Sequence, residues 1–153
     1  MSIQQSSGAV GNIIVDGQKL WDDILETAKF GGTAKGGIKR LTLTQEDRQV
    51  RDWFTKACEA VGCSVSYDSL GNQFARRPGT DDALAPITMG SHLDTQPTGG
   101  KFDGIIGVLG GLAVLRTLHE TKRETRHPIE LINWTNEEGS RFPPCMMGSG
   151  VFA

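Results

Sequence analysis

The chain has 153 residues, of which 37% are apolar and 22% charged, so it is long enough for one globular domain with its own core. A formal net charge of −2 provides no basic field for nucleic acid, and no apolar run is long enough to cross a bilayer. The first residues show no secretion signal, and three cysteines without CxxC spacing indicate free thiols in a reducing compartment. We therefore expect a cytoplasmic protein with no nucleic-acid or membrane partner.

The first half of the chain predicts two amphipathic helices behind a flexible lead. Residues 1–15 form the lead, and Asp16 can cap the first helix, which stops at a pair of glycines. Its inward face would comprise Leu20, Trp21, Ile24, Leu25 and Ala28. A second helix opens at Thr44, where Thr44 and Asp47 resemble a capping box, and ends at Gly62. Its buried stripe would comprise Val50, Trp53, Phe54, Ala57, Cys58 and Val61.

The second half of the chain predicts strands around one helix. Residues 63–68 and 73–77, joined by a tight turn, indicate a hairpin or a sheet edge. Residues 87–92 form a buried strand, 104–119 an amphipathic helix, and 128–135 a second apolar strand. Strand, helix and strand at this spacing indicate a βαβ crossover. We therefore predict an α/β fold with a mostly parallel sheet flanked by helices.

Side chains that can carry chemistry follow both strands of this crossover. His92 ends the first strand, and Asp94 comes two residues later. Asp103 precedes the helix, and Glu137 and Glu138 follow the second strand. In an open α/β sheet, sites form outside the carboxyl ends of the strands. We therefore expect these five side chains to cluster around His92 at one edge of the sheet.

Several of these residues also have a purely structural interpretation. A lone histidine at a strand end more often makes a structural hydrogen bond than binds a metal ion. Asp94 could orient the imidazole of His92 through its second ring nitrogen, or it could form an Asx turn. Asp103 could cap the following helix or direct its carboxylate out of the sheet edge. For His119 and His127 we favour the structural interpretation.

The adjacent acids Glu137 and Glu138 are the sharpest signal in the sequence. Neighbouring carboxylates repel each other, and the fold does not need two at this position. At a bent strand end, one could bind a metal ion, and the other could take a proton from a water that the ion makes acidic. In the alternative interpretation both are solvated acids in a loop. The sequence contains no GxxxxGK[ST] phosphate loop and no GxSxG nucleophile motif.

Three motifs give the chain a family resemblance. GSHLDT, GGKFDG and TNEEGSRF, in this order, resemble those of the two-metal amidohydrolases that include N-carbamoyl-L-amino-acid hydrolases, beta-ureidopropionases and allantoate amidohydrolases. The resemblance covers most of the chain and implies a zinc-exopeptidase-like fold. It also implies hydrolysis of a linear amide or ureido C–N bond in a small-molecule substrate, with two divalent ions, zinc or manganese, as cofactors. Related peptidases of this fold have a longer insert between His92 and Asp103, so the short spacing here favours the carbamoylase branch.

The resemblance also implies roles for individual residues. It implies that His92 binds one ion, that Asp103 bridges the two, and that Glu138 binds the other. Glu137 would be the general base, and Asp94 would be the catalytic partner of His92. The peptide bond after Asp103 would be cis and would turn the bridging carboxylate toward the metals.

The chain departs from this family in its length. The family has two further metal-binding histidines and a lid and dimerisation domain downstream, and neither His119 nor His127 matches those positions. We therefore expect residues 16–153 to be the N-terminal part of a metal-dependent catalytic domain, inactive alone, whose parent enzyme is a homodimer. Two alternatives stay open: a dipeptidase or aminopeptidase that uses the same site, and a non-catalytic fragment or interaction module.

Overall fold

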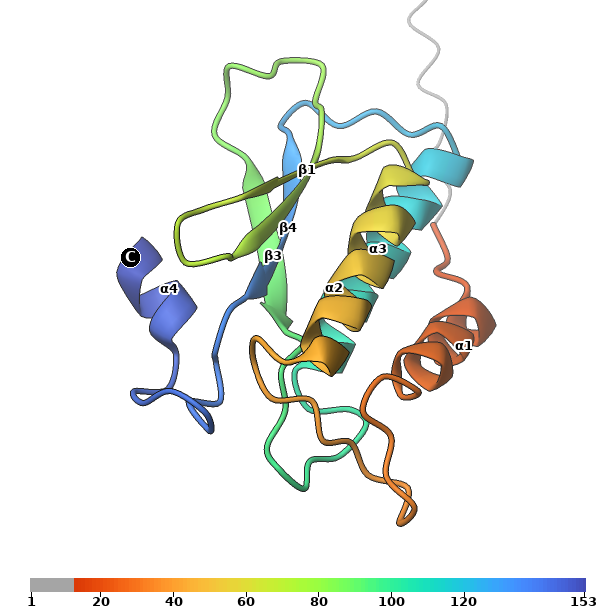
Figure 1. Cartoon of the computed structure of the whole chain (residues 1–153). Coiled ribbons are helices and arrows are strands. Elements are labelled where there is room, and N and C mark those ends of the chain that lie inside the picture. The colour runs from red at the N-terminus through yellow and green to blue at the C-terminus, as the bar shows by residue number, and fades with distance from the viewer. Residues whose placement is uncertain (1–12) are drawn as a thin grey trace, which may run out of the picture.

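The computed structural model describes residues 13–153, which form one sheet with helices on both faces (Figure 1). The elements, in chain order, are α1 (Gly17–Thr27), α2 (Gln45–Glu59), β1 (Ser64–Tyr67), β2 (Gln73–Arg77), β3 (Ile87–His92), α3 (Ile105–Glu120), β4 (Ile129–Trp134) and α4 (Met147–Phe152). The predicted α/β class is confirmed. Of the predicted flexible lead at residues 1–15, residues 1–12 lie outside the described part of the chain. Within residues 13–153, no helix is both long and apolar enough to cross a membrane.

The four strands of the sheet have the order β1-β2-β4-β3. β3 and β4 are parallel and are joined through α3, which is the predicted βαβ crossover. β1 pairs antiparallel with β2, and β2 pairs antiparallel with β4, so in the described residues the sheet is mixed and not mostly parallel. The reason is that a tight turn returns the chain antiparallel, and the resulting hairpin then adds to the free side of β4.

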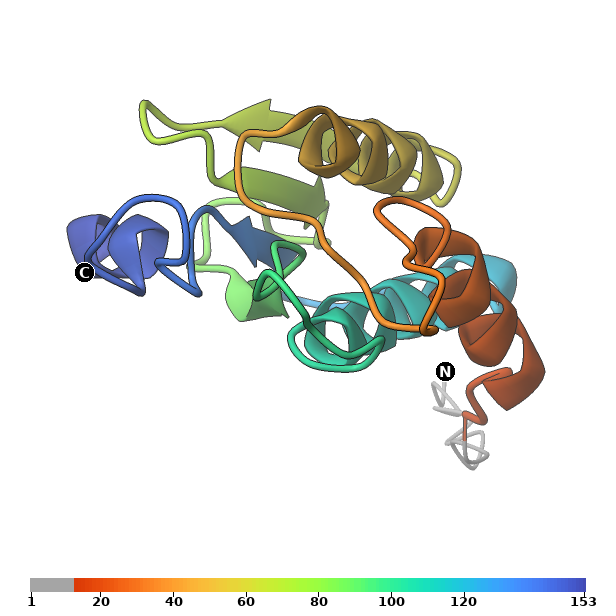
Figure 2. The ribbon, with the colours of Figure 1, turned by 60° about the horizontal axis from the view of Figure 1, so that its bottom comes forward.

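Helix α1 begins as predicted but buries fewer side chains than expected. The Asp16 carboxylate accepts a hydrogen bond at 2.9 Å from the backbone N–H three residues later. Ile24 is buried, whereas Trp21 and Leu25 are 45% and 41% exposed. The predicted inward face was too wide, because α1 lies at the rim of the helical layer (Figure 2). Trp21 stacks on Phe102 at this rim, with ring centroids 6.1 Å apart.

Helix α2 has the predicted cap and is tied to the end of β4. The Thr44 hydroxyl accepts the backbone N–H of Asp47 at 3.4 Å, and the Asp47 carboxylate reaches back to the backbone N–H of Leu43 at 2.8 Å. Asp47 also accepts a hydrogen bond from Arg51 at 2.9 Å. Arg51 in turn donates to the hydroxyl of Thr135 at 3.0 Å, one residue beyond β4. Through Arg51, α2 therefore holds Thr135, the residue that follows β4.

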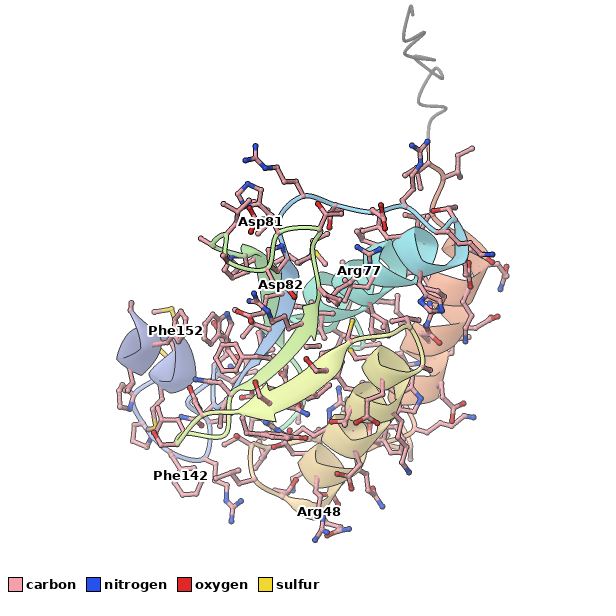
Figure 3. All side chains as sticks on the ribbon, turned by 90° about the horizontal axis from the view of Figure 1, so that it is seen from above. Arg48, Arg77, Asp81, Asp82, Phe142 and Phe152 are labelled. Carbon is pink, nitrogen blue, oxygen red and sulfur yellow. The ribbon has the colours of Figure 1, made fainter. Side chains whose placement is uncertain are left out.

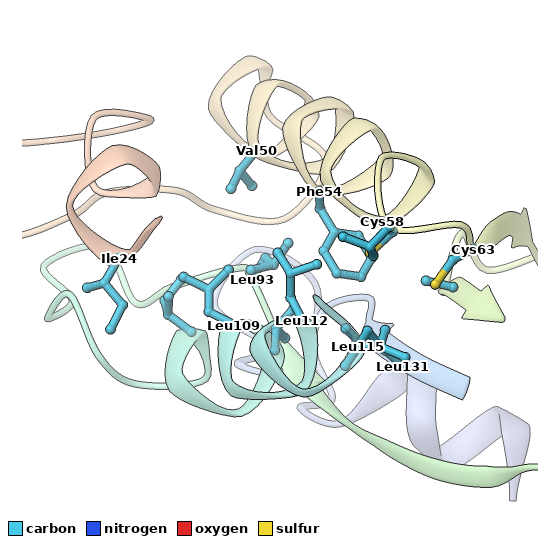
Figure 4. Packing of buried hydrophobic residues seen from close by; sticks show 14 residues of the cluster. Ile24, Val50, Phe54, Cys58, Cys63, Leu93, Leu109, Leu112, Leu115 and Leu131 are labelled. Carbon is cyan, nitrogen blue, oxygen red and sulfur yellow. The ribbon is translucent and has the colours of Figure 1, made fainter. Parts of the chain in front are cut away.

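The core lies between the sheet and the layer formed by α1, α2 and α3 (Figure 4). Phe54 of α2 and Leu131 of β4 are fully buried there. Gly111 lets α3 approach the sheet, because a Cβ at this position would lie 2.4 Å from a Leu131 methyl group. Cys58 and Cys63 belong to this core, and burial raises the pKa of both thiols, to about 11 for Cys63. All three cysteines are free, as predicted.

Helix α4 lies on the opposite face of the sheet and was not predicted (Figure 1). Phe152 at its end packs against Phe74 and Trp134, with ring centroids 5.6 Å and 5.2 Å away. Phe142 and Phe152 both lie on this side of the molecule (Figure 3). No local pattern marks this helix, because six residues that include two glycines carry no helical periodicity and little helix propensity.

Candidate metal centre

The parallel pairing of β3 and β4 brings predicted site residues to one edge of the sheet. His92 pairs with Trp134 at the carboxyl ends of the two strands, so the strands end side by side. His92, Glu137 and Glu138 each offer one ligand atom, and the three atoms lie within 4.8 Å of one another. With Asp94, whose carboxylate lies 3.7 Å from His92 Nδ1, four of the five predicted side chains gather at the predicted edge.

His92 has one ring nitrogen engaged and the other available. Nδ1 lies 2.9 Å from the backbone carbonyl oxygen of Asp94, which can only accept, so Nδ1 carries a proton, and in the neutral imidazole the lone pair is on Nε2. Nε2 lies 3.3 Å from a carboxylate oxygen of Glu137. The Asp94 carboxylate lies 3.7 Å from Nδ1. The predicted contact with the imidazole was through the Asp94 carboxylate. In the structure, Asp94 orients the imidazole through its main-chain carbonyl.

The Asp94 carboxylate joins the two strand ends. Its two oxygens accept the backbone N–H groups of Glu137 and Glu138, each at 3.3 Å. The chain presents both N–H groups on a tight turn, in which Asn136 and Gly139 have positive φ angles of 56° and 63°. Burial raises the pKa of Asp94, while the neighbouring imidazole and the two N–H groups act against this shift. The buried carboxylate is thus the link between the His-x-Asp motif and the paired glutamates.

Glu137 and Glu138 face different partners. Oε2 of Glu138 accepts a hydrogen bond from the side-chain amide of Gln96. Gln96 in turn accepts a hydrogen bond from the Ser140 hydroxyl at 2.9 Å. The Glu137 carboxylate faces the imidazole of His92. The two adjacent acids are therefore chemically distinct, one tied to an amide and the other beside the histidine.

Two fully buried side chains hold the backbone N–H and carbonyl of Leu93, the middle residue of the His-x-Asp motif. Neither was predicted from the sequence. Arg40 Nε donates to the Leu93 carbonyl at 2.8 Å, and its Nη1 donates to two carbonyls at the end of α1 and just beyond, at 2.9 Å and 2.8 Å. Asn133 accepts the Leu93 N–H at 2.9 Å and donates to Gln73 at 2.7 Å. Burial lowers the pKa of Arg40 to about 10, although the nearby carboxylates of Asp47 and Asp94 act against this shift. A polar residue inside an apolar strand could have pointed to Asn133, but no local pattern marks Arg40.

Asp103 is the predicted ligand that the structure does not bring into the group. Its side chain is exposed and is not one of the three that lie together. The next residue does touch the site, because a Cβ at Gly104 would lie 2.5 Å from His92 Nε2, and the φ of 68° there favours glycine. The expected cis peptide bond after Asp103 is wrong for this structure, since the cis bond within residues 13–153 is Pro143-Pro144.

The other residues with reactive side chains lie elsewhere. His119 of α3 faces Gly62, where a Cβ would lie 3.3 Å from its Nδ1. His127 lies 2.9 Å from the carbonyl oxygen of Ala85 through its Nδ1. The His127 contact is structural, as we favoured for it, and His119 lies beside Gly62. Cys145 is exposed and lies in the loop that follows the paired glutamates.

The donors that lie together fit a divalent cation. A neutral imidazole nitrogen and carboxylate oxygens occur as ligands of both zinc and manganese, so the set does not select between them. Because residue 104 is a glycine, no Cβ crowds His92 Nε2, and this nitrogen faces the Glu137 carboxylate at 3.3 Å. Ions held by His92 and by Glu138 would both have the Glu137 carboxylate nearby.

Comparison with known proteins places these residues in a family. Residues 88–153 match the peptidase family M20/M25/M40. The N-carbamoyl-L-amino-acid amidohydrolase of Rhizobium meliloti is 52% identical over 139 residues, which cover 91% of this chain and 33% of that protein. The crystal structure of a hydantoinase/carbamoylase family amidase from Burkholderia ambifaria matches with a TM-score of 0.90 at 51% identity, over 92% of this chain and 35% of the other.

A more distant structure shares the fold alone. A zinc-dependent exopeptidase from Bacteroides vulgatus matches with a TM-score of 0.67 at 18% identity, over 92% of this chain and 56% of the other. The chain spans about a third of the length of the curated relatives that it matches. All three motifs that carry the sequence resemblance lie inside the matched segment 88–153. The resemblance is confirmed: most of the chain is similar to N-carbamoyl-L-amino-acid amidohydrolases and to hydantoinase/carbamoylase family amidases, and residues 88–153 match the peptidase family M20/M25/M40.

Proposed function

We propose that the intact protein is a metal-dependent hydrolase of a linear ureido C–N bond and that its substrate is an N-carbamoyl amino acid. One observation carries the proposal. Two adjacent carboxylates stand at the strand edge that bears His92, with Glu137 3.3 Å from its Nε2 and Glu138 turned to Gln96. This arrangement suits one acid for metal binding and the other for proton transfer. The carbamoyl group in the name of the Rhizobium meliloti relative supports the ureido bond as the one cleaved.

Each residue of the site has a role in this reaction. Two divalent ions, zinc or manganese, would polarise the ureido carbonyl and make a water molecule reactive. His92 and Asp103 would hold one ion, and Asp103 and Glu138 the other, which requires the exposed Asp103 side chain to turn inward. Glu137 would take a proton from the attacking water and deliver it to the leaving nitrogen. Asp94 would keep His92 in the tautomer that presents Nε2.

The test is a pair of conservative substitutions in the intact protein. Glu137→Gln should keep both ions and lower kcat with an N-carbamoyl amino acid by about 10²–10⁴-fold, because an amide cannot accept the proton. Glu138→Gln should lower the metal content, because it removes an anionic donor. Elemental analysis and steady-state kinetics measure the two effects, and Glu59→Gln, on the exposed end of α2, is the matched control. If Glu137→Gln strips the ions and Glu138→Gln retains them, the two roles are reversed.

A dipeptidase or aminopeptidase activity is the second candidate. The peptidase family that matches residues 88–153 and the exopeptidase that shares the fold both favour it. Hydrolysis of a peptide needs the same carbonyl polarisation and the same general base. Steady-state assays with N-carbamoyl amino acids and with dipeptides on one preparation decide between the two. A kcat/KM that is higher for dipeptides would replace the ureido substrate in our proposal.

The non-catalytic alternative concerns the 153-residue chain by itself. We propose that residues 16–153 correspond to the N-terminal part of the catalytic domain, in a cytoplasmic enzyme that is a homodimer when intact. His92, Asp103 and Glu138 would give each of two ions only two protein donors, where a catalytic zinc normally has three and a water. The 153 residues alone should therefore bind zinc weakly and show no turnover. Calorimetric titration that found two tightly bound ions per chain, together with measurable turnover, would contradict this expectation.

A further inference from the structure

Gln96 is a side chain of the site that no motif singled out. It lies in the turn after β3, exposed, between the His-x-Asp motif and Asp103. Its Nε2 donates to Oε2 of Glu138, and its Oε1 accepts from the Ser140 hydroxyl at 2.9 Å. An amide nitrogen can only donate and an amide oxygen can only accept. The Glu138 carboxylate, which only accepts, therefore faces the amide N–H, and the Ser140 hydroxyl holds the amide oxygen at the other end.

The backbone that carries Gln96 is held on both sides. Before it, the backbone N–H of Thr95 donates to the carbonyl of Arg40 at 2.8 Å, and the Thr95 hydroxyl accepts the backbone N–H of Arg40 at 2.9 Å. After it, Gly99 exchanges two backbone hydrogen bonds with Ile38, each at 2.9 Å. Although the side chain is exposed, it starts from a fixed main chain. Its contact with Glu138 is thus part of the folded geometry of the site.

We propose that Gln96, oriented by Ser140, is a positioning residue that assigns the adjacent carboxylates Glu137 and Glu138 their different roles. The amide N–H engages Oε2 of Glu138 and leaves the other carboxylate oxygen to bind the cation. Within the described residues, no side-chain amide donates to Glu137, whose carboxylate lies beside the imidazole and keeps its lone pairs for a proton. The inference rests on the proposed function only in taking Glu138 as the metal ligand.

The size of the effect follows from the position of Gln96 behind a ligand. Hydrogen bonds to a ligating group fix its orientation, and their loss typically lowers metal affinity by about 10–100-fold. Ser140 acts only through Gln96, so its contribution should vanish when the amide is absent. The two substitutions should therefore be non-additive, which is the signature of residues that act in series.

The experiment measures zinc affinity and does not depend on turnover. Intact protein is stripped with a chelator, and Zn²⁺ affinity is determined by competition with a chromophoric chelator for Gln96→Leu, Ser140→Ala and the double variant. Gln96→Leu should weaken binding of one ion by about 10–100-fold. Ser140→Ala should weaken it less, and the double variant should match Gln96→Leu. Thr98→Ala, at an exposed position in the same turn, is the control and should bind as the wild type does.

The urea midpoint of the metal-free variants separates positioning from a structural role. If Gln96 positions Glu138, all four variants should unfold at the wild-type midpoint. Wild-type zinc affinity in Gln96→Leu would overturn the proposal, as would an equal effect of Ser140→Ala with and without Gln96. A lower metal-free midpoint in Gln96→Leu would assign the residue to the fold and also overturn it. A failure to hydrolyse ureido substrates would contradict the proposed function but would not change these zinc affinities. The proposed function and the role of Gln96 can therefore fail independently.

Discussion

The end of β3 and the start of α3 meet at His92 but are held in opposite ways. At the end of β3, buried side chains form hydrogen bonds with the N–H and the carbonyl of Leu93, and the Asp94 carboxylate accepts two backbone N–H groups. At the start of α3, Asp103 is exposed, and Phe102 stacks on Trp21 at the surface. One half of the site is therefore fixed by buried hydrogen bonds, and the other half rests on a surface turn.

This difference explains why the structure gathers some predicted residues and not others. A buried hydrogen bond is costly to break, so the groups it joins keep their positions in the folded chain. Such bonds hold His92, Glu137 and Glu138 close together, because Asp94 connects the two loops that carry them. A side chain on an exposed turn has no such constraint and can adopt several rotamers. Substitutions at the end of β3 should therefore lower the free energy of unfolding of the metal-free protein more than substitutions at the start of α3.

The largest loss should come from Arg40→Met, at the held end of β3. The change removes a fully buried cation and its three hydrogen bonds to carbonyl groups. The free energy of unfolding should fall by about 3–5 kcal/mol in urea denaturation. Arg48→Met, on the exposed side of α2 (Figure 3), is the matched control and should change it by less than about 0.5 kcal/mol. Equal stability of the two variants would show that Arg40 does not hold this strand end.

Asn133→Leu should have the next largest effect. Leucine has a similar volume but leaves the Leu93 N–H and the Gln73 amide oxygen without their present partners in a buried region. Two unsatisfied buried groups should lower the free energy of unfolding by about 2–4 kcal/mol. The His92 imidazole signals in NMR should also shift, because its backbone neighbour moves. Unchanged His92 signals in a destabilised variant would confine Asn133 to the core and detach it from the site.

Gly104→Ala should cost less, because it perturbs the turn on the exposed side of the site. The added Cβ would lie 2.5 Å from His92 Nε2, and alanine is strained at a φ of 68°. Stability should fall by about 1–3 kcal/mol. Gly110→Ala, in the middle of α3 with open space around its Cβ, is the matched control and should stabilise the helix by up to about 1 kcal/mol. If both variants were stabilised, the turn would be able to move away from His92 freely.

The smallest change in stability should come from Asp103→Asn. The side chain is exposed at a surface turn, so the metal-free protein should lose less than about 0.5 kcal/mol. Zinc affinity of the intact protein should nevertheless fall, since the proposed function makes Asp103 a donor to both ions. Urea denaturation without metal and chelator competition with zinc measure the two quantities. A loss of stability comparable to that of Asn133→Leu would show that both halves of the site are held alike.

Much of the fold was determined by local patterns in the sequence. The strands β2 and β3 have the predicted bounds, and α1 and α2 begin at the predicted caps, Asp16 and Thr44. Caps, turn residues and apolar periodicity act over a few residues, so they can be read without knowing the rest of the structure. Placing His92 and the paired glutamates at strand ends also required only the order of strand, helix and strand, because parallel strands end at the same edge.

Only the tertiary structure decided how these residues are held and which partners they have. Arg40 and Asn133 reach Leu93 from 53 and 40 positions away along the chain, and Gln96 reaches Glu138 across 42 positions. The antiparallel addition of the hairpin to β4 and the packing of α4 depend likewise on distant segments. Such contacts leave no local pattern, because their energy comes from burial and from hydrogen bonds that exist only when the whole chain is folded. The sequence therefore predicted which residues could carry the chemistry, and the fold decided which of them lie together.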